Sequence, residues 1–215
     1  MPAIRKTVVS AEVYAAIKRS LFEGEWAPGE RIDRKALAER FGISQTPVND
    51  ALNRLTGEGL IDNRSRDGFF APLYDDAELA DLFAARAGLE SIAARLCAEG
   101  ANDADKRALA DIFAEFGDAI RPGSEAAYLA ADKNFHKLVL EISGSARLNE
   151  VESAFGIAYR SYEHGLVRPP EETLAEHRSI VGAISAGDGR AAQLAMAEHL
   201  LATRRALLDR SATRG

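Results

Sequence analysis

The chain has 215 residues, a formal net charge of −6, 47% hydrophobic residues and 28% charged residues. This balance is typical of a globular protein, and it excludes a disordered chain and a generally basic coat for nucleic acid. A single cysteine, Cys97, excludes an internal disulfide and a cysteine-cluster metal site, and its place in a helical apolar pattern predicts a buried thiol.

Three helical patterns occupy the first part of the chain. Residues 10–23 repeat apolar side chains every four positions, which predicts an amphipathic helix. Residues 33–41 form a second pattern, which Gly42 should end. Residues 44–56 form a third pattern, with Pro47 in the first turn, where its missing N–H costs little.

Two short strand patterns follow, "LIDNR" and "FFAPL", around the turn "SRDG". The order helix, helix, helix, hairpin is that of a winged helix-turn-helix. From Asp75 onward the pattern predicts helices and no strand, over residues 76–99, 103–118, 124–143, 147–165, 171–186 and 188–209. We therefore expect a mainly α protein, with a winged helix-turn-helix domain over 1–73 and an all-α antiparallel helical bundle over 74–215.

The charge is unevenly distributed between these two parts. Residues 1–72 carry 11 Lys/Arg and 10 Asp/Glu, whereas residues 73–215 carry 16 Lys/Arg and 23 Asp/Glu. A near-neutral part joined to an acidic part suggests two separate tasks.

The N-terminus has no apolar core of a signal peptide, and no run approaches the roughly 20 apolar residues that span a bilayer, so we expect a cytoplasmic protein without a membrane partner.

The third predicted helix has an unusual polar face. Its outward side carries Thr46, Asn49, Asp50 and Asn53, close to Gln45 at the tip. In a helix-turn-helix the second helix of the pair enters the major groove, where an amide side chain can pair with an adenine edge. The alternative for these amides is an ordinary solvated helix surface, although asparagine is a mediocre helix former.

The stretch "ERIDRKALAERFGISQTPVNDALNRLTGEGLIDNRSRDGFFA" resembles the winged-helix domain of the GntR family of transcriptional regulators. The elements that carry the likeness are "PGERI", "LAERFGIS", "TPV" and the wing. The helical remainder resembles the FCD type of ligand-binding domain, so the likeness covers about residues 10 to 210. It implies a DNA-binding regulator, expected to be a repressor and not an enzyme.

The chain departs from the family's usual "SRTPVREAL", because Gln45 and Asn49 stand where the family has arginines that contact guanine edges and phosphate. The loss of two cations should weaken salt-dependent backbone binding. The operator sequence therefore differs, or the remaining cations contribute more. The DNA contacts implied by the resemblance are Arg31, Arg34, Lys35, Ser44, Gln45, Thr46, Asn49, Asn53, Arg64, Arg66 and Gly68.

The four histidines all lie in the helical part. Asp132 and His136 are spaced i, i+4, so they share one helix face, while His177 and His199 lie on later helices. That pair alone fits core packing as well as a metal site. The resemblance implies more, since metal-binding FCD domains fill these four positions with ligands for a divalent ion. We expect zinc, with nickel or manganese as alternatives, and we expect His164 not to bind it.

The resemblance also suggests an effector site. Arg86 matches an arginine that often points into the cavity of this domain, where it could bind the carboxylate of a small organic acid. The alternative is a surface or dimer-interface salt bridge, and Glu90, one turn on, is a candidate partner.

We expect a homodimer on a palindromic operator. The competing function is a metal-dependent hydrolase with an accessory winged helix, but no HExxH motif is present.

Overall fold

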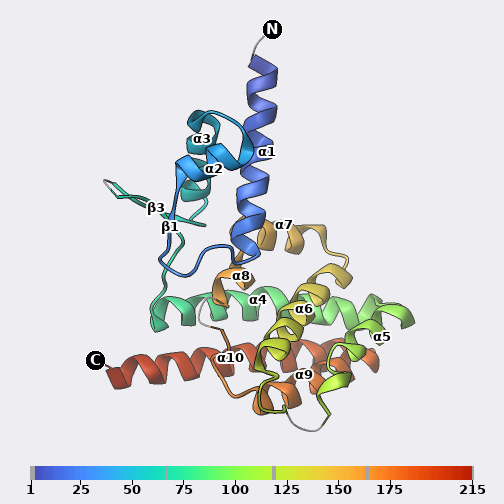
Figure 1. Cartoon of the computed structure of the whole chain (residues 1–215). Helices are drawn as coiled ribbons and strands as arrows, with labels where there is room; N and C mark the ends of the chain where they lie inside the picture. Colours follow the sequence, from blue (N-terminus) through green and yellow to red (C-terminus); the bar gives the residue numbers. More distant parts are fainter. Residues whose placement is uncertain (1–2, 66, 118–119, 163–164, 215) are drawn as a thin grey trace. The chain divides into compact units, whose positions relative to one another are not determined.

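The computed structural model describes residues 3–65, 67–117, 120–162 and 165–214. The chain divides into two compact units (Figure 1). The first comprises Met1–Leu73 with Ala154–Gly156, and the second comprises Tyr74–Ser153 with Ile157–Gly215. Within the described ranges, no helix combines the length and the apolar character needed to cross a membrane.

The described part of the first unit contains three helices and a small sheet. Its elements are α1 (Ala3–Phe22), β1 (Arg31–Ile32), α2 (Arg34–Phe41), α3 (Gln45–Gly57), β2 (Asp62–Arg64) and β3 (Gly68–Phe70). The strand order is β1–β3–β2, and both pairs are antiparallel. The predicted hairpin is the β2–β3 pair. Strand β1 has two residues, too few for an alternating pattern, so the sequence did not predict it.

The predicted polar helix is α3, and its burial pattern follows the expected faces. Its buried residues are Pro47, Val48, Ala51, Leu52 and Leu55. Before it, α2 starts at a capped end, where the Asp33 carboxylate accepts from the backbone N–H groups of Lys35 and Ala36 at 2.7 and 3.2 Å. It ends at Gly42, which has a left-handed φ of 65°. The fold class, a winged helix-turn-helix followed by a helical unit, is confirmed.

The described residues of the second unit form helices joined by loops, and they contain no strand. Its elements are α4 (Asp76–Gly100), α5 (Asp103–Asp111), the 3₁₀ helix η1 (Ala114–Phe116), α6 (Glu125–Ile142), α7 (Ala146–Phe155), α8 (Ile157–Ser161), α9 (Pro170–Ser185) and α10 (Gly189–Arg214). Cys97 is fully buried and donates a hydrogen bond to the Val139 carbonyl at 3.0 Å, which confirms the predicted buried thiol.

Several helix boundaries differ from the prediction, and α10 continues to Arg214 although the prediction ended it at residue 209. The single helix expected over 147–165 is wrong, because Gly156 takes a left-handed φ of 57° and separates α7 from α8. The helix expected over 103–118 ends at Asp111, with η1 following it. Helix α1 begins at Ala3 and not at residue 10.

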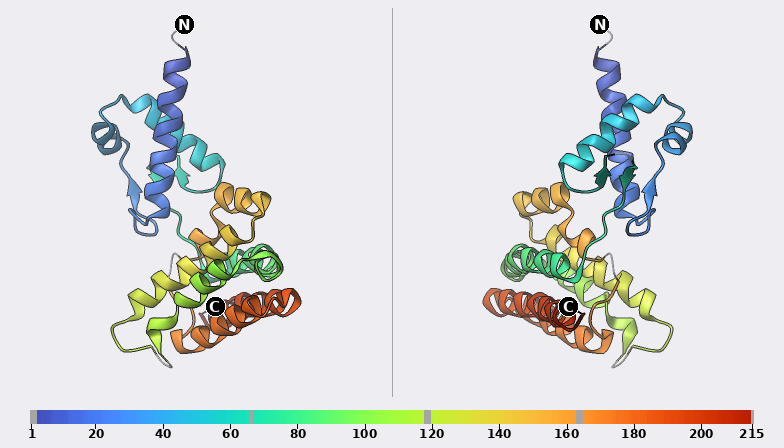
Figure 2. Two further views of the ribbon diagram at one scale, coloured as in Figure 1. Left: turned by 90° about the vertical axis from the view of Figure 1, so that its right-hand side faces the viewer. Right: turned by 90° about the vertical axis from the view of Figure 1, so that its left-hand side faces the viewer.

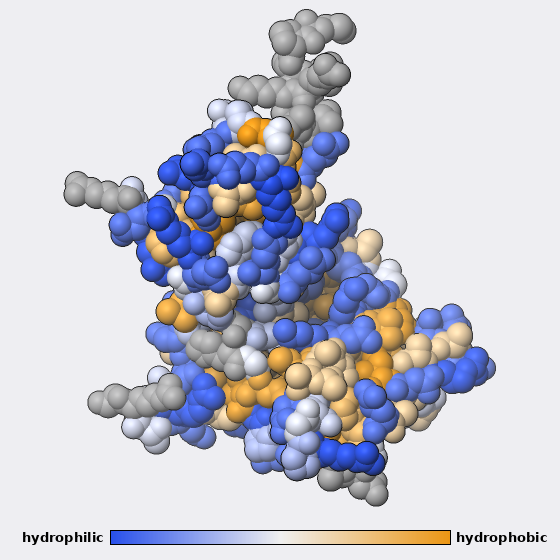
Figure 3. Space-filling view, viewed as in Figure 1, coloured by the Kyte–Doolittle hydropathy of each residue, from blue (hydrophilic) through white to orange (hydrophobic). Residues whose placement is uncertain are grey.

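Helices α4 and α10 run antiparallel beside each other, since Asp76 at the start of α4 binds Arg210 near the end of α10. The side views in Figure 2 show this pair with α5 and α6 to one side of it. A single apolar cluster fills the space between α4, α6, α9 and α10. On the face shown in Figure 3, hydrophobic residues also reach the surface over the α5–α6 region.

Candidate metal centre and DNA-reading face

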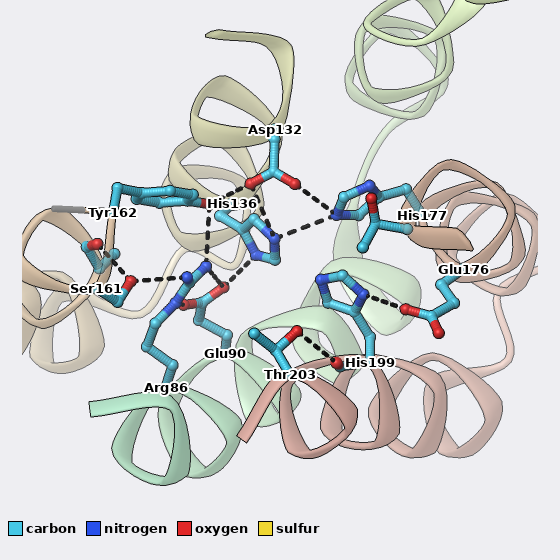
Figure 4. A network of polar contacts seen from close by, with 12 residues as sticks. Arg86, Glu90, Asp132, His136, Ser161, Tyr162, Glu176, His177, His199 and Thr203 are labelled. Carbon is cyan, nitrogen blue, oxygen red and sulfur yellow. Dashed lines mark hydrogen bonds and ion pairs between the residues drawn. The ribbon is translucent and has the colours of Figure 1, made fainter. Parts of the chain in front are cut away.

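A buried polar cluster lies between three helices of the second unit (Figure 4). Asp132 and His136 come from α6, His177 from α9 and His199 from α10. All four side chains are buried. The three imidazoles each offer a ligand atom, and these atoms lie within 4.8 Å of one another. The structure thus brings together the four side chains that the family resemblance implied as metal ligands.

Two separations between these ligand atoms match those in a small tetrahedral site. The Nε2 atoms of His136 and His177 are 3.3 Å apart, and Asp132 Oδ2 lies 3.4 Å from His177 Nε2. Ligands held at zinc–nitrogen distances in a tetrahedron are separated by roughly 3.3–3.4 Å. The second carboxylate oxygen, Oδ1, is 3.9 Å from His136 Nε2. The donor set, three imidazoles and one carboxylate, is also one that zinc accepts.

Acidic partners fix the orientation of two of the rings. His136 Nδ1 hydrogen-bonds to Glu90 Oε2, and His199 Nδ1 hydrogen-bonds to Glu176 Oε2 at 2.7 Å. A carboxylate only accepts, so each Nδ1 carries the proton. In a neutral ring the other nitrogen, Nε2, then presents a lone pair toward the centre. Histidines that bind a metal ion usually donate the other ring N–H to such a carboxylate, which fixes the orientation of the ring.

Two tyrosines complete the shell around the other two groups. The Tyr128 hydroxyl lies 3.0 Å from His177 Nδ1 and 2.8 Å from Thr173 Oγ1. Tyr162 donates to Asp132 Oδ1 at 2.5 Å, which leaves Oδ2 facing His177. The hydrogen bond from Tyr162 therefore selects the carboxylate oxygen that faces the histidines.

The environment keeps two of the histidines neutral. Burial lowers the pKa of His177 well below its ordinary value, and the neighbouring histidines His199 and His136 lower it further. Burial also lowers the pKa of His199, although Glu176 opposes this shift. A neutral imidazole is the form that binds a metal ion, so the cluster is prepared for one near pH 7.

The carboxylates that hold these rings, Glu90 and Glu176, are ionised because their charged partners outweigh the effect of burial. Burial alone would raise the pKa of Glu90, but Arg86 and the histidine partner outweigh it and hold the value at about 2. Burial would likewise raise the pKa of Glu176, yet its histidine partner and Arg168 bring it to about 2. Such weakly basic carboxylates are poor proton acceptors near pH 7.

Arg86 is bound within the cluster rather than free in a cavity. It is 1% exposed, and its Nε donates to Glu90 Oε1 at 2.6 Å. Its two terminal nitrogens reach Ser161 Oγ at 2.8 Å and the Tyr162 hydroxyl at 3.2 Å. Arg86 thus has the partner suggested by the i, i+4 spacing, and Glu90 connects it directly to His136.

A pocket opens onto this cluster, with about 330 Å³ of space that includes some open to solvent. Its polar wall contains Arg86, Asp132, His136, Tyr162, Arg168, Thr173, His199 and Thr203, and its apolar wall contains Phe83, Leu166 and Val167. Arg168 is paired with Glu176 at 2.7 and 2.8 Å, so it is linked to His199 through one carboxylate. A small polar ligand in this pocket would meet both arginines and three of the four candidate ligands, Asp132, His136 and His199.

The DNA candidates on α3 line its outer side. Gln45, Thr46 and Asn53 are exposed and Asn49 is half-buried. Ser44 occupies the N-cap position but makes no side-chain cap hydrogen bond. These side chains therefore project from α3 away from its buried stripe.

The candidate cations differ in their ion pairing. Lys35 lies 3.8 Å from Glu39 and Arg64 lies 3.9 Å from Asp62, both exposed. No ion pair within the described residues involves Arg31 or Arg34. Gly68 has a φ of 104°, which a non-glycine residue rarely adopts, and the Arg31 guanidinium packs against it. Arg66 and His164 lie outside the described residues.

Sequence reasoning missed several supporting residues, namely Tyr128, Ser161, Tyr162, Thr173, Glu176 and Arg168. Apart from Arg168, which pairs with Glu172 and Glu176 a short distance along the chain, they have partners on other helices, up to 76 positions away, so no local spacing reveals them. A partial signal existed for Glu176, which directly precedes His177, but its carboxylate binds His199.

Comparison with known proteins matches both units. A family model described as "FCD domain" matches residues 81–202, and one described as "Bacterial regulatory proteins, gntR family" matches residues 9–71. The chain is 27% identical over 195 residues to an HTH-type transcriptional regulator, YdhC, of Bacillus subtilis (strain 168), covering 89% of this chain and 85% of that one.

Two further similarities extend over most of the chain. It is 28% identical over 203 residues to a probable D-xylose utilization operon transcriptional repressor of Paenarthrobacter nicotinovorans, with 93% of this chain and 88% of the other covered. The solved structure of E. coli McbR/YncC aligns with a TM-score of 0.71 at 20% identity, covering 94% of this chain and 98% of that one. At that identity, the structural match supports the fold alone.

Proposed function

The chain belongs to the GntR family of bacterial regulatory proteins and carries an FCD domain, and from this premise we propose that it is a metal-dependent repressor that responds to a small organic acid. That it is a DNA-binding transcriptional regulator follows from the family. In the proposed division, residues 1–73 read the operator and residues 74–215 bind the metal, the effector and a second copy of the chain. Relatives named as repressors support the direction of control.

The metal proposal rests on one observation above the others, namely three buried imidazoles that turn Nε2 toward a common point while partners hold Nδ1. Asp132, His136, His177 and His199 would hold one divalent ion. Three imidazoles and one carboxylate form a donor set that zinc accepts, and we therefore propose zinc, with nickel or manganese as alternatives. When bound, such an ion supplies a Lewis-acidic position for an oxygen ligand.

The effector proposal follows from the pocket. Its polar wall would meet an anion with the Arg86 and Arg168 guanidinium groups and the Tyr162 hydroxyl. Each arginine is already paired with a carboxylate. A small monocarboxylate therefore suits the local charge better than a multiply charged acid. Binding would shift the balance between conformations that differ in DNA affinity.

The homodimer proposal has support from an exposed apolar strip on α4 and α10. Leu194 is 60% exposed, Ile92 39% and Leu208 36%. Leu194 and Leu208 are separated by fourteen residues on α10, with half-buried Leu201 midway. Arg95 hydrogen-bonds to Gln193 at 3.4 Å, so the two helix segments lie side by side. A second copy would cover this strip, and two-fold symmetry would give a palindromic operator.

The hydrolase alternative is less favoured by the same geometry. A hydrolytic metal site needs a general base within reach of its water. Glu90 and Glu176 have pKa values near 2, and Asp132 accepts from Tyr162. The three carboxylates that contact the histidines are therefore weak or occupied bases.

The proposal is tested by measuring the affinity of the full chain for DNA from its own promoter region. The chain would be assayed with zinc, with chelator, and with zinc plus each member of a panel of small monocarboxylates. We expect at least one acid to weaken binding only when zinc is present. Effects that persist unchanged in chelator would remove the metal from the proposed response.

A further inference from the structure

We propose that Arg34 and Asn49 act as one guanine-reading unit, in which a side chain from α2 fixes the amide of a side chain from α3. This inference rests on the proposed role of residues 1–73 in reading DNA, and it names a base preference that the role alone does not specify. It differs from the adenine pairing that is open to an isolated amide side chain.

The contact between the two residues is a side-chain hydrogen bond. Arg34 is the first residue of α2, and Asn49 lies one turn into α3. Arg34 Nη1 donates to Asn49 Oδ1 at 3.4 Å. The assignment of this amide atom is firm on chemical grounds, because a guanidinium group has only donors and must face the oxygen. The amide NH₂ group then points away from Arg34.

The position of Arg34 is supported from a second side. Its guanidinium carbon lies 6.0 Å from the centre of the Phe69 ring, within the range of a cation–π contact. Phe69 belongs to β3 and is 5% exposed, so the ring is a fixed support. Arg34 therefore lies between the base of the wing and the reading helix.

Arg34 also keeps its full charge available. Other cations of this unit are paired: Lys35 with Glu39, Arg40 with Glu25, Arg54 with Glu58 and Arg64 with Asp62. No such pair within the described residues involves Arg34. Exposure of this side chain then leaves its remaining N–H donors free for a ligand.

The base preference follows from the balance of donors and acceptors. In the major groove guanine presents two acceptors, O6 and N7, whereas adenine presents one acceptor and one donor. Adenine recognition by asparagine uses the amide oxygen to accept from the base. In Asn49 that oxygen is directed to Arg34, so the pair presents donors from both side chains. Donors facing two acceptors select guanine.

The test is selection of preferred sites from a random double-stranded DNA library by the full chain and its variants. The wild type should select guanine at the position read by Asn49. Arg34→Ala should lower affinity for that site about tenfold or more and turn the preference toward adenine, because the amide oxygen becomes free. Arg34→Lys keeps the charge without the planar fork, so it should lose the preference while keeping the salt dependence.

Lys35→Ala is the matched control, since Lys35 neighbours Arg34 on α2 but is paired with Glu39. It should weaken binding to all sequences by one factor. In the double variant Arg34→Ala with Asn49→Ala, the loss should be smaller than the product of the single losses, because the residues act together. An unchanged base preference in Arg34→Ala, or independent losses, would overturn the reading unit. Failure of the wild type to select any site would instead overturn the DNA-reading role itself.

Discussion

The buried cluster of the second unit and the outer face of α3 are both polar, but the cluster is buried and the α3 face is mostly exposed to solvent. In the cluster the side chains are buried, and His136, His177 and His199 each have a protein partner for Nδ1. On α3, water can satisfy Gln45, Thr46 and Asn53, which are exposed. The side chains of the cluster are thus oriented by the protein itself, whereas the exposed side chains of α3 are open to solvent or to a ligand.

The largest effect is expected from removing one member of the buried ion pair between Arg86 and Glu90. Arg86→Ala should lower the free energy of unfolding by about 3–5 kcal/mol, because it leaves the Glu90 charge buried beside His136 without its cation. Arg95→Ala is a matched control on the same helix, since Arg95 pairs with Glu99 at the same spacing but is half exposed. It should cost less than about 1 kcal/mol. Equal losses in chemical denaturation would refute the distinction.

A second prediction concerns Glu152, whose carboxylate accepts a hydrogen bond from the backbone N–H of Ala158. Burial raises the pKa of Glu152 to about 7, and the charge of Glu90 adds to the effect. A folded state with a raised carboxyl pKa binds the proton more tightly, so its stability is complete at low pH and falls between about pH 4.5 and 7.

The full shift corresponds to at most about 3 kcal/mol. Glu152→Gln should therefore leave stability unchanged near pH 4 and raise it above pH 7, as measured by urea unfolding across this range. The exposed Glu150 on the same helix is the control, and Glu150→Gln should show no such crossover. A difference between Glu152→Gln and the wild type that does not vary with pH would contradict the assignment.

Addition of a metal ion should raise the stability of the protein through the buried cluster and not through the α3 face. Zinc at a hundredfold excess over its Kd should raise the stability of the wild type by about 2.7 kcal/mol. His136→Ala and His177→Ala should each lose most of this increment, whatever their stability without zinc, while His164→Ala should keep it. Melting curves with zinc and with chelator give the increment for each variant. Retention of the increment in His177→Ala would exclude that ring as a ligand.

The smallest expected effect is at the apolar strip of α4 and α10. Leu194→Glu should weaken the dimer about tenfold, which corresponds to about 1.4 kcal/mol, because a charge replaces an apolar contact. Val151→Glu, on α7 and 39% exposed, should leave the dimer intact. Sedimentation over a range of concentrations measures both. A dimer that tolerates Leu194→Glu would have its interface elsewhere.

The sequence predicted the winged-helix order and the fold class because apolar periodicity and capping residues such as Asp33 and Gly42 are local signals. It suggested Asp132 and His136 as a pair because they are one turn apart. It could not supply the partners of that pair, since Glu90 and Tyr162 come from other helices. It also missed the break at Gly156, because a glycine inside a helical pattern does not by itself announce a left-handed residue.

The central claim, a metal centre built from Asp132 and three histidines, is tested most directly by X-ray absorption at the zinc edge of the full chain. We expect one zinc per chain, with three imidazole nitrogens and carboxylate oxygen at about 2.0–2.2 Å, and one imidazole fewer in His199→Ala. A chain that binds no stoichiometric zinc, or a His199→Ala spectrum identical to that of the wild type, would contradict the claim.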